Sequence, residues 1–167
     1  MRRKRSPTHP GDRTPRPLRR IPEEGGAQGK LPELAVCPGC GASYRKGRWT
    51  WQAAPVGSYE RTCPACERIA ARYPAGVLRA EGAFAVAHRD ELVALVRNVE
   101  ERERATHPLK RVMGIEEDER GFVAETTDAE LARALGRALH RAYSGELEQA
   151  PTTAERENLV RVRWLRE

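Results

Sequence analysis

Two short stretches decide the fold of this sequence: CPGC at residues 37–40 and CPAC at residues 63–66. Two residues separate the cysteines within each stretch, and 22 residues separate the two stretches. This spacing lets a tight knuckle turn direct both sulfur atoms at one ion, and two such turns supply the four thiolates of a closed, tetrahedral structural site. We therefore predict that the chain binds Zn²⁺ through four ligands, Cys37, Cys40, Cys63 and Cys66.

Two other uses of these cysteines stay open at the level of sequence. Iron occupies Cys₄ sites of similar spacing, so the spacing does not identify the metal. A single Cys-x-x-Cys pair is also the form of a redox dithiol, although two matched pairs favour metal binding. No adjacent Asp or His suggests the open coordination position that a catalytic zinc ion needs, so the predicted role of the metal is structural.

The distribution of apolar residues explains why a metal is needed. Leu, Ile, Val and Phe number 9 among the first 82 residues and 20 among the last 85. A chain with less than about 20% of these residues rarely buries enough apolar surface to offset the entropy lost on folding. Zinc binding contributes roughly 10 kcal/mol or more to the folding of a small module, so the metal would replace the missing core of the first half.

Charge and composition divide the chain into three parts. The formal charge of +6 results from +7 in residues 1–20 and −1 in the remainder. The N-terminal stretch is also rich in Pro and Gly, which disfavours regular structure. We expect a disordered basic arm at residues 1–35, a Cys₄ zinc ribbon at residues 36–73 and a second domain at residues 74–167.

The spacing of apolar residues predicts helices and a hairpin in the second domain. Residues 88–105 place apolar side chains at i, i+3, i+4 and i+7, which is one face of a helix. Residues 109–117 and 121–127 are extended and flank a charged turn, which is typical of a hairpin. Thr127, with Glu130 three residues further on, has the form of a capping box and would open a second helix.

The remaining elements complete a ferredoxin-like order. Residues 159–164 alternate apolar and polar side chains, which predicts a half-buried strand, and a polar loop at residues 146–156 precedes it. A weaker strand at residues 76–80 would give the order β-α-β-β-α-β, and without it the domain is αββαβ. The predicted fold class is therefore α+β.

Basic and aromatic residues are interleaved in the cysteine-rich part, where residues 36–82 carry a net charge of +4. Arg and Lys bind phosphates, and exposed aromatic rings stack on unpaired bases. The candidates for a nucleic-acid surface are Arg45, Lys46, Arg48, Trp49, Trp51 and Arg61. An equally open interpretation is that the two tryptophans shield the metal site as the core of a small module.

Two further arginines lie in the last predicted strand. Arg161 and Arg163 would share one face of the sheet and could contact RNA, or they could belong to an ordinary solvated face. Residues 83–150 carry a net charge of −4, so most of the second domain should repel phosphate. This domain is better suited to positioning or to protein contacts.

Several classes of protein are excluded or disfavoured. No run of about 18 apolar residues predicts a membrane span, and no apolar segment of a signal peptide follows the basic residues 1–5. We therefore expect a cytoplasmic protein, whose reducing environment favours metal-bound cysteines over disulfides. The sequence contains no nucleophile elbow, phosphate loop or zinc-hydrolase motif, so we predict that it is not an enzyme.

The residues also resemble known families. The segment from Cys37 to Cys66 is similar to a zinc ribbon of the treble-clef or rubredoxin-knuckle kind. Together with Gly47-Arg48-Trp49, Arg68-Ile69-Ala70, Thr126-Thr127-Asp128 and the stretch LVRVRW at residues 159–164, it resembles small, largely uncharacterised bacterial zinc-ribbon proteins. More distantly it resembles the N-terminal part of the archaeal and eukaryotic large-ribosomal-subunit export adaptor, a family with more Cys-x-x-Cys pairs and further domains.

This resemblance implies association with the ribosome or ribosomal RNA. Combined with the basic residues, it predicts a zinc-stabilised RNA-binding protein whose partners are RNA and possibly ribosomal proteins, with no membrane involvement. Two alternatives stay open. The chain could be a DNA-binding, transcription-associated ribbon, or a protein-interaction module or small metalloenzyme that works through its acidic second domain.

Overall fold

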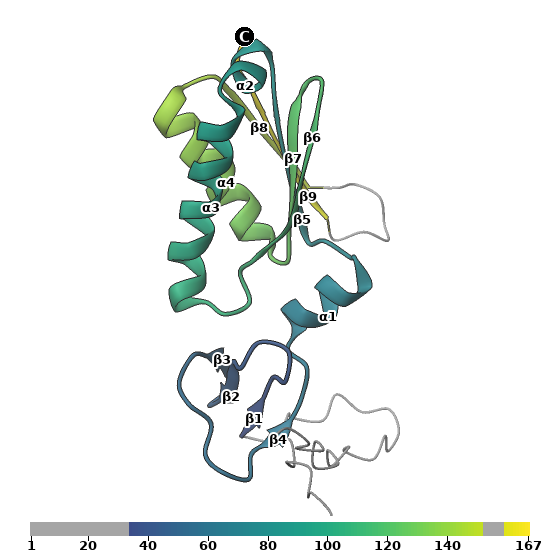
Figure 1. Cartoon of the computed structure of the whole chain (residues 1–167), viewed down its shortest axis with the longest axis vertical. Helices are drawn as coiled ribbons and strands as arrows, with labels where there is room; N and C mark the ends of the chain where they lie inside the picture. Colours follow the sequence, from purple (N-terminus) through teal and green to yellow (C-terminus); the bar gives the residue numbers. More distant parts are fainter. Residues whose placement is uncertain (1–33, 152–158) are drawn as a thin grey trace, which may run out of the picture.

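A computed structural model describes residues 34–151 and 159–167 of the 167-residue chain. It is a mixed α+β structure with a small sheet and a larger sheet at opposite ends of the molecule, as Figure 1 shows. The α+β class predicted from the sequence is therefore confirmed. The predicted basic arm at residues 1–35 lies almost wholly outside the described residues.

The small sheet contains four short strands in the order β3-β2-β1-β4. They are β1 (Ala35–Val36), β2 (Ser43–Arg45), β3 (Arg48–Thr50) and β4 (Tyr59–Glu60). Strands β2 and β3 form a hairpin whose two turn residues, Lys46 and Gly47, have φ values of 47° and 80°. A two-residue hairpin turn needs positive φ at both positions to match the twist of the strands, which explains the glycine.

The first cysteine pair lies in the turn between β1 and β2, as predicted. The N–H of Gly41 donates to the carbonyl of Cys37, and the N–H of Cys37 donates to the carbonyl of Ala42, both at 2.8 Å. Gly41 has a φ of 78°, which a residue with a side chain rarely adopts. These bonds fold the chain back on itself, so that Cys37 and Cys40 point to the same side.

The second cysteine pair does not form a second knuckle, which corrects the prediction. It opens helix α1 (Pro64–Ala71), with Cys63 at the N-cap position. Proline is favoured in the first turn of a helix because its missing N–H would have no partner there, so α1 begins at Pro64. The helix ends where Arg72 adopts the left-handed conformation, with a φ of 50°.

The larger sheet contains five strands in the order β6-β7-β5-β9-β8. They are β5 (Gly76–Glu81), β6 (Val112–Asp118), β7 (Gly121–Thr126), β8 (Glu146–Pro151) and β9 (Val160–Leu165). The uncertain first strand of the prediction is confirmed as β5, and the hairpin is confirmed as β6 and β7. Strand β5 is antiparallel to β7 and parallel to β9.

Strand β8 corrects the prediction of a loop at residues 146–156. It pairs antiparallel with β9 at the edge of the sheet. In the predicted β-α-β-β-α-β order the last strand follows the second helix directly. Here β8 comes between α4 and β9, so β9 runs in the opposite direction and lies parallel to β5. An edge strand needs few apolar side chains, and among residues 146–150 of this strand only Leu147 packs against the core.

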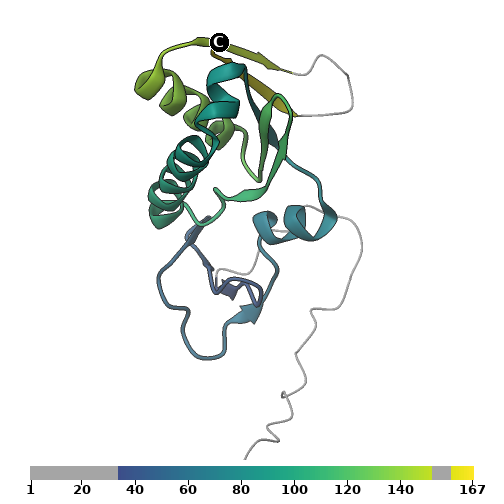
Figure 2. The same cartoon turned by 45° about the horizontal axis from the view of Figure 1, so that its top comes forward.

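Three helices cover one face of the larger sheet: α2 (Ala83–Ala87), α3 (Arg89–Thr106) and α4 (Ala129–Tyr143). Figures 1 and 2 show them on the same side of the strands. The largest side chains of the core between these layers are fully buried and include Leu78, Phe122, Leu135 and Trp164. Helix α3 matches its predicted range of residues 88–105 closely, and α4 is the second predicted helix, whereas α2 was not predicted.

The predicted cap of α4 is wrong by one residue. Asp128 is the N-cap, and its side chain accepts a hydrogen bond of 2.9 Å from the N–H of Leu131. The hydroxyl of Thr127 instead donates to the carbonyl of Leu109 at 2.6 Å. In the part of the chain that the structure covers, no helix is both long and apolar enough to cross a membrane.

Candidate metal centre and the basic surface beside it

The knuckle and the N-terminus of α1 bring the four predicted cysteines together. Their Sγ atoms all lie within 4.8 Å of one another, and those of Cys40 and Cys63 are 3.7 Å apart. A disulfide would need about 2.05 Å, and all four cysteines are free. Four metal–sulfur bonds of about 2.3 Å in a tetrahedron place sulfur atoms about 3.8 Å apart, so the cluster fits a closed four-thiolate metal site.

Main-chain donors around the sulfurs also suit thiolate ligands. The N–H of Cys63 donates to the Sγ of Cys37 at 3.3 Å, and the N–H of Cys66 donates to the Sγ of Cys63 at 3.5 Å. Both N–H groups belong to the start of α1, where the helix dipole favours negative charge. Because the second cysteine pair opens α1, the start of this helix supplies two of the sulfur atoms together with the N–H groups and the dipole that stabilise negative charge on them.

The pKa values of the thiols depend on burial. Burial raises the pKa of Cys63 to about 12 and also raises the pKa of Cys66. Burial acts in the same direction on Cys40, but the backbone of Ala42 and the guanidinium of Arg111 outweigh it and lower its pKa to about 7. A metal ion bound by these thiols would displace their protons.

Arg111 is part of this site, although nothing in the sequence pointed to it. The residue precedes β6 in the larger sheet and is only 7% exposed. Its Nη1 lies 3.4 Å from the Sγ of Cys66, and its Nη2 lies 3.8 Å from the Sγ of Cys63. A guanidinium placed here opposes the net negative charge that four thiolates confer on a divalent ion.

Trp49 belongs to the buried core of residues 34–73, which contain the small sheet and α1 and which we call the small module. It is 9% exposed, and its ring lies 5.6 Å from that of Tyr44 in a tilted arrangement. Cys37, Cys63 and two alanines form the rest of this buried cluster, against which Leu109 of the second domain packs. The burial of Trp49 supports its interpretation as a shield of the metal site and leaves little of its ring for base stacking.

Trp51 is 37% exposed but is held by α3. Its Nε1–H donates to the carbonyl of Arg104 at 2.6 Å. The guanidinium of Arg104 also lies over the indole, 5.6 Å from the ring centroid. Trp51 therefore joins the small module to the second domain, a role that the alternation of aromatic and basic residues did not predict.

The basic side chains of the module surround the β2–β3 hairpin and follow β4. Arg45 and Arg48 face each other across the hairpin turn, Lys46 occupies the turn, and Arg61 comes directly after β4. Lys46, Arg48 and Arg61 are exposed and form no ion pair with any of the described residues. Arg45 donates only to the neutral side chain of Gln52, at 3.4 Å. We call Arg45, Lys46, Arg48 and Arg61 the basic surface.

A groove of about 570 Å³ separates the hairpin from the loop after α3. Arg48 and Trp49 line one side, and His107, Leu109 and Lys110 line the other. Its volume is in the range of small-ligand sites, and its walls combine apolar and positively charged groups. Part of the basic surface therefore borders a concave site formed by both domains.

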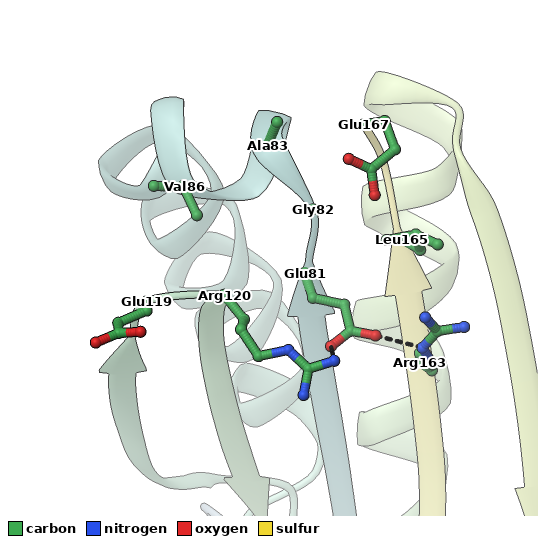
Figure 3. A pocket seen from close by; sticks show the side chains of 9 residues that line it. All are labelled: Glu81, Gly82, Ala83, Val86, Glu119, Arg120, Arg163, Leu165 and Glu167. Carbon is green, nitrogen blue, oxygen red and sulfur yellow. Dashed lines mark hydrogen bonds and ion pairs between the residues drawn. The ribbon is translucent and has the colours of Figure 1, made fainter.

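Arg161 and Arg163 share the face of the larger sheet opposite the helices, as predicted. Val160, Val162 and Trp164 of β9 are buried on the helix side, so the two arginines alternate onto the other side. Figure 3 shows the side chain of Arg163 directed at the carboxylate of Glu81, with Arg120 on the opposite side of the same carboxylate. Glu148 also pairs with Arg163, at 3.5 Å. The charge of Arg163 is thus neutralised within the protein.

No protein-family model, curated protein or solved structure matches this chain. The arrangement of the molecule itself must therefore carry any conclusion about function. That arrangement is a four-cysteine cluster compatible with a metal ion, closed by Arg111 and placed beside an exposed basic surface.

Proposed function

We propose that the protein is a zinc-stabilised RNA-binding protein that associates with ribosomal RNA in the cytoplasm. Zn²⁺ is the proposed metal because a closed set of four cysteine ligands is typical of structural zinc. The metal would hold the β2–β3 hairpin and α1 in place, and the basic surface would bind phosphates. The ribosome enters the proposal through the distant resemblance to the export adaptor.

One contrast between the two domains carries the proposal. Residues 83–150 carry a net charge of −4, and although the exposed Arg102 and Arg137 form no ion pair with the described residues, other basic side chains there pair with carboxylates: Arg97 with Glu100 at 3.1 Å, and Lys110 with Glu103 at 2.6 Å. The exposed members of the basic surface have no such partner among the described residues. An unpaired guanidinium keeps its full capacity to bind phosphate, and the basic surface lies in the segment 36–82, whose net charge is +4. The basic surface is therefore the part of the described residues best suited to a polyanion.

The groove beside the basic surface favours a single-stranded ligand. The apolar side chain of Leu109 lines this groove and Arg48 borders it, which suits a base that is flipped out of a helix, with its phosphate on the arginine. A duplex is too wide to enter a site of this size. We therefore expect the protein to prefer unpaired RNA, with the groove binding one nucleotide and the hairpin binding the neighbouring backbone.

A direct binding experiment tests the proposal. Fluorescence anisotropy with a labelled single-stranded RNA would give the affinity, and unlabelled RNA and DNA of the same sequence would compete for the protein. Preferential competition by RNA supports the proposal, and equal or stronger competition by DNA favours the transcription-associated alternative, because only RNA offers the 2′-hydroxyl.

A second experiment tests the association with ribosomes. Cell extract would be sedimented through a sucrose gradient with and without ribonuclease treatment, and the protein would be detected in each fraction. We expect it to travel with ribosomal particles and to be released by ribonuclease. Migration with the free proteins in both gradients would remove the ribosome from the proposal, whatever the affinity for RNA in isolation.

A further inference from the structure

We propose that Arg111 acts as the counter-charge of the metal centre and makes the docking of the two domains depend on the bound metal. The inference goes beyond RNA binding and requires only that the four cysteines hold a divalent ion. It concerns a positioning residue, because the guanidinium of Arg111 contacts the sulfur atoms and not the ion itself.

The second domain holds Arg111 firmly. Its N–H donates to the hydroxyl of Thr127 at 2.9 Å, and its carbonyl accepts from the N–H of Thr127, also at 2.9 Å. Its Nε donates to the carbonyl of Pro108 at 2.9 Å. Three hydrogen bonds therefore fix the backbone and the guanidinium plane before the metal centre is considered, so Arg111 is pre-organised toward the sulfurs.

The charges explain why the interaction would depend on the metal. Four thiolates around a divalent ion carry a net charge of −2, and the guanidinium offers two N–H donors to two of the sulfurs. Without the ion, nothing holds the four sulfur atoms together as an anionic set beside the guanidinium, and Arg111 is only 7% exposed and has no carboxylate partner among the described residues. A buried, unpaired charge is costly, so loss of the metal should drive the domains apart.

Few other contacts join the two domains. Leu109 packs against the small buried cluster, and Trp51 donates to the carbonyl of Arg104. The Trp51 contact is partly exposed to water, whereas the guanidinium of Arg111 is buried against the sulfurs. The metal centre is therefore the dominant charged contact between the domains, and the groove that both of them line would keep its shape only while they are docked.

Fluorine NMR can separate docking from folding. The chain has three tryptophans, so protein labelled with 5-fluorotryptophan gives one resonance each for Trp49, Trp51 and Trp164. Trp49 reports the small module, Trp164 reports the core of the second domain, and Trp51 reports the contact between them. A Trp51→Phe variant assigns the Trp51 resonance and breaks the other interdomain hydrogen bond without touching the metal centre.

The decisive variant is Arg111→Met, which keeps the apolar stem and removes the charge. Titration with Co²⁺, followed by its absorption in a tetrahedral thiolate site, would measure metal affinity in each protein. We expect Arg111→Met to bind about tenfold to a hundredfold more weakly, as is usual when a partner of the ligands is removed. Saturated with metal, it should keep the native Trp49 and Trp164 resonances but lose the native position of Trp51.

Matched controls isolate the role of the charge. Arg97→Met removes an exposed arginine of α3 that pairs with Glu100 and should leave both readouts unchanged. Trp51→Phe should bind Co²⁺ like the wild type, and Arg111→Lys should recover part of the affinity. An Arg111→Met protein with wild-type Co²⁺ affinity and a native Trp51 resonance would overturn the proposal.

The wild-type protein provides a test that does not depend on the variant folding. If the Trp164 resonance shows that Arg111→Met is unfolded, the metal would instead be removed from the wild type with a chelator under reducing conditions. We expect the Trp51 resonance to shift while the Trp164 resonance stays native. A Trp51 resonance that stays in place after the metal is removed would show that docking does not need the metal and would reject the inference.

Discussion

The indole N–H of Trp51 donates to the main-chain carbonyl of Arg104, with 2.6 Å between Nε1 and the oxygen. Arg104 lies in the last turn of α3, where helix carbonyls have no partner within the helix. A side chain of the small module therefore caps a helix of the second domain. The same ring lies beneath the guanidinium of Arg104, which adds a cation–π contact to the hydrogen bond.

This contact leads to a prediction that separates a structural role of Trp51 from base stacking. Trp51→Leu should lower the free energy of unfolding by about 1–2 kcal/mol, because it removes one hydrogen bond and one cation–π contact. Affinity for single-stranded RNA should change by less than about twofold, since the loss of a stacked base would cost about 1–3 kcal/mol. Urea unfolding and RNA titration check the two parts, and unchanged stability with much weaker RNA binding would restore the stacking interpretation.

Removal of the metal should unfold the small module and spare the second domain. The module has few buried apolar side chains, whereas Leu78, Phe122 and Trp164 anchor a core that contains no cysteine. Elemental analysis should find one zinc ion per chain, and Cys37→Ser should abolish it. Hydrogen exchange read by mass spectrometry should then lose protection in residues 34–71 alone, and full protection there in the presence of a chelator would contradict a metal-dependent fold.

Neutralising the hairpin should weaken RNA binding and its dependence on salt. The triple variant Arg45→Gln, Lys46→Gln and Arg48→Gln removes three charges from the basic surface. Each lost phosphate contact lowers the slope of log affinity against log salt by about 0.7 for single strands, so three contacts lower it by about 2. Anisotropy titrations over a range of KCl concentrations measure the slope.

The matched control for the hairpin removes the same charge from the helices. Arg97→Gln, Arg133→Gln and Arg137→Gln together change the net charge equally, and two of these arginines pair with glutamates in their own helices. This control should keep a slope close to that of the wild type. An equal decrease of the salt slope in both triple variants would show that the overall charge of the protein, and not the hairpin, attracts RNA.

Glu81 should make stability depend on pH. It is 6% exposed and accepts from Arg163 and Arg79, and Arg163 is the main cause of its lowered pKa. A lowered folded pKa stabilises the native state above the ordinary glutamate pKa of about 4.3, and this contribution disappears as the pH falls through the folded value. Glu81→Gln should therefore cost about 1–2 kcal/mol near neutral pH and less in acid.

Urea unfolding at about pH 7 and about pH 3 would measure this difference for the wild type and the variant. Glu130→Gln is the appropriate control, because Glu130 is 58% exposed at its side chain and pairs only with Arg133 of the next turn. At neutral pH, Glu130→Gln should lower the free energy of unfolding much less than Glu81→Gln does. A Glu81→Gln penalty that is as large in acid as at neutral pH would mean that the charge of Glu81 is not what stabilises the sheet.

Gly136 in α4 should resist replacement by alanine. A Cβ at this position would lie 2.5 Å from Cγ1 of Val162 and 3.0 Å from Cδ1 of Leu147. Alanine normally stabilises a helix by about 1 kcal/mol relative to glycine, but the clash with β9 should reverse the sign and cost about 1–3 kcal/mol. Gly114→Ala is the control, since a Cβ there meets no atom within 4 Å, and thermal unfolding of both variants measures the contrast.

The sequence predicted those elements whose signal is local and repeated. Helix α3 and strand β9 follow from apolar periodicity, because burying one face of each element requires that periodicity. Strand β7 follows from the charged turn between two extended segments, α4 from its capping signal, and β5 was only a weaker candidate. Strand β8 escaped prediction because its residues are mostly polar, and a polar edge strand cannot be distinguished from a loop without its partner β9. The predicted N-cap of α4, Thr127, is one residue before the observed cap, Asp128. Both residue types are good caps, and only the hydrogen bond of Thr127 to Leu109 decides between them.

The sequence alone predicted that the four cysteines form one cluster, because the spacing of two residues within each pair limits the geometry that their sulfur atoms can adopt. The tertiary structure decided what surrounds them. Arg111 is 45 residues away from Cys66 in the chain, and Trp51 is 53 residues away from Arg104. Such contacts depend on how two separately stabilised sheets dock against each other, and no pattern in the sequence encodes that docking locally. The ligands of the metal could therefore be predicted from the sequence, whereas its counter-charge could be found only in the folded chain.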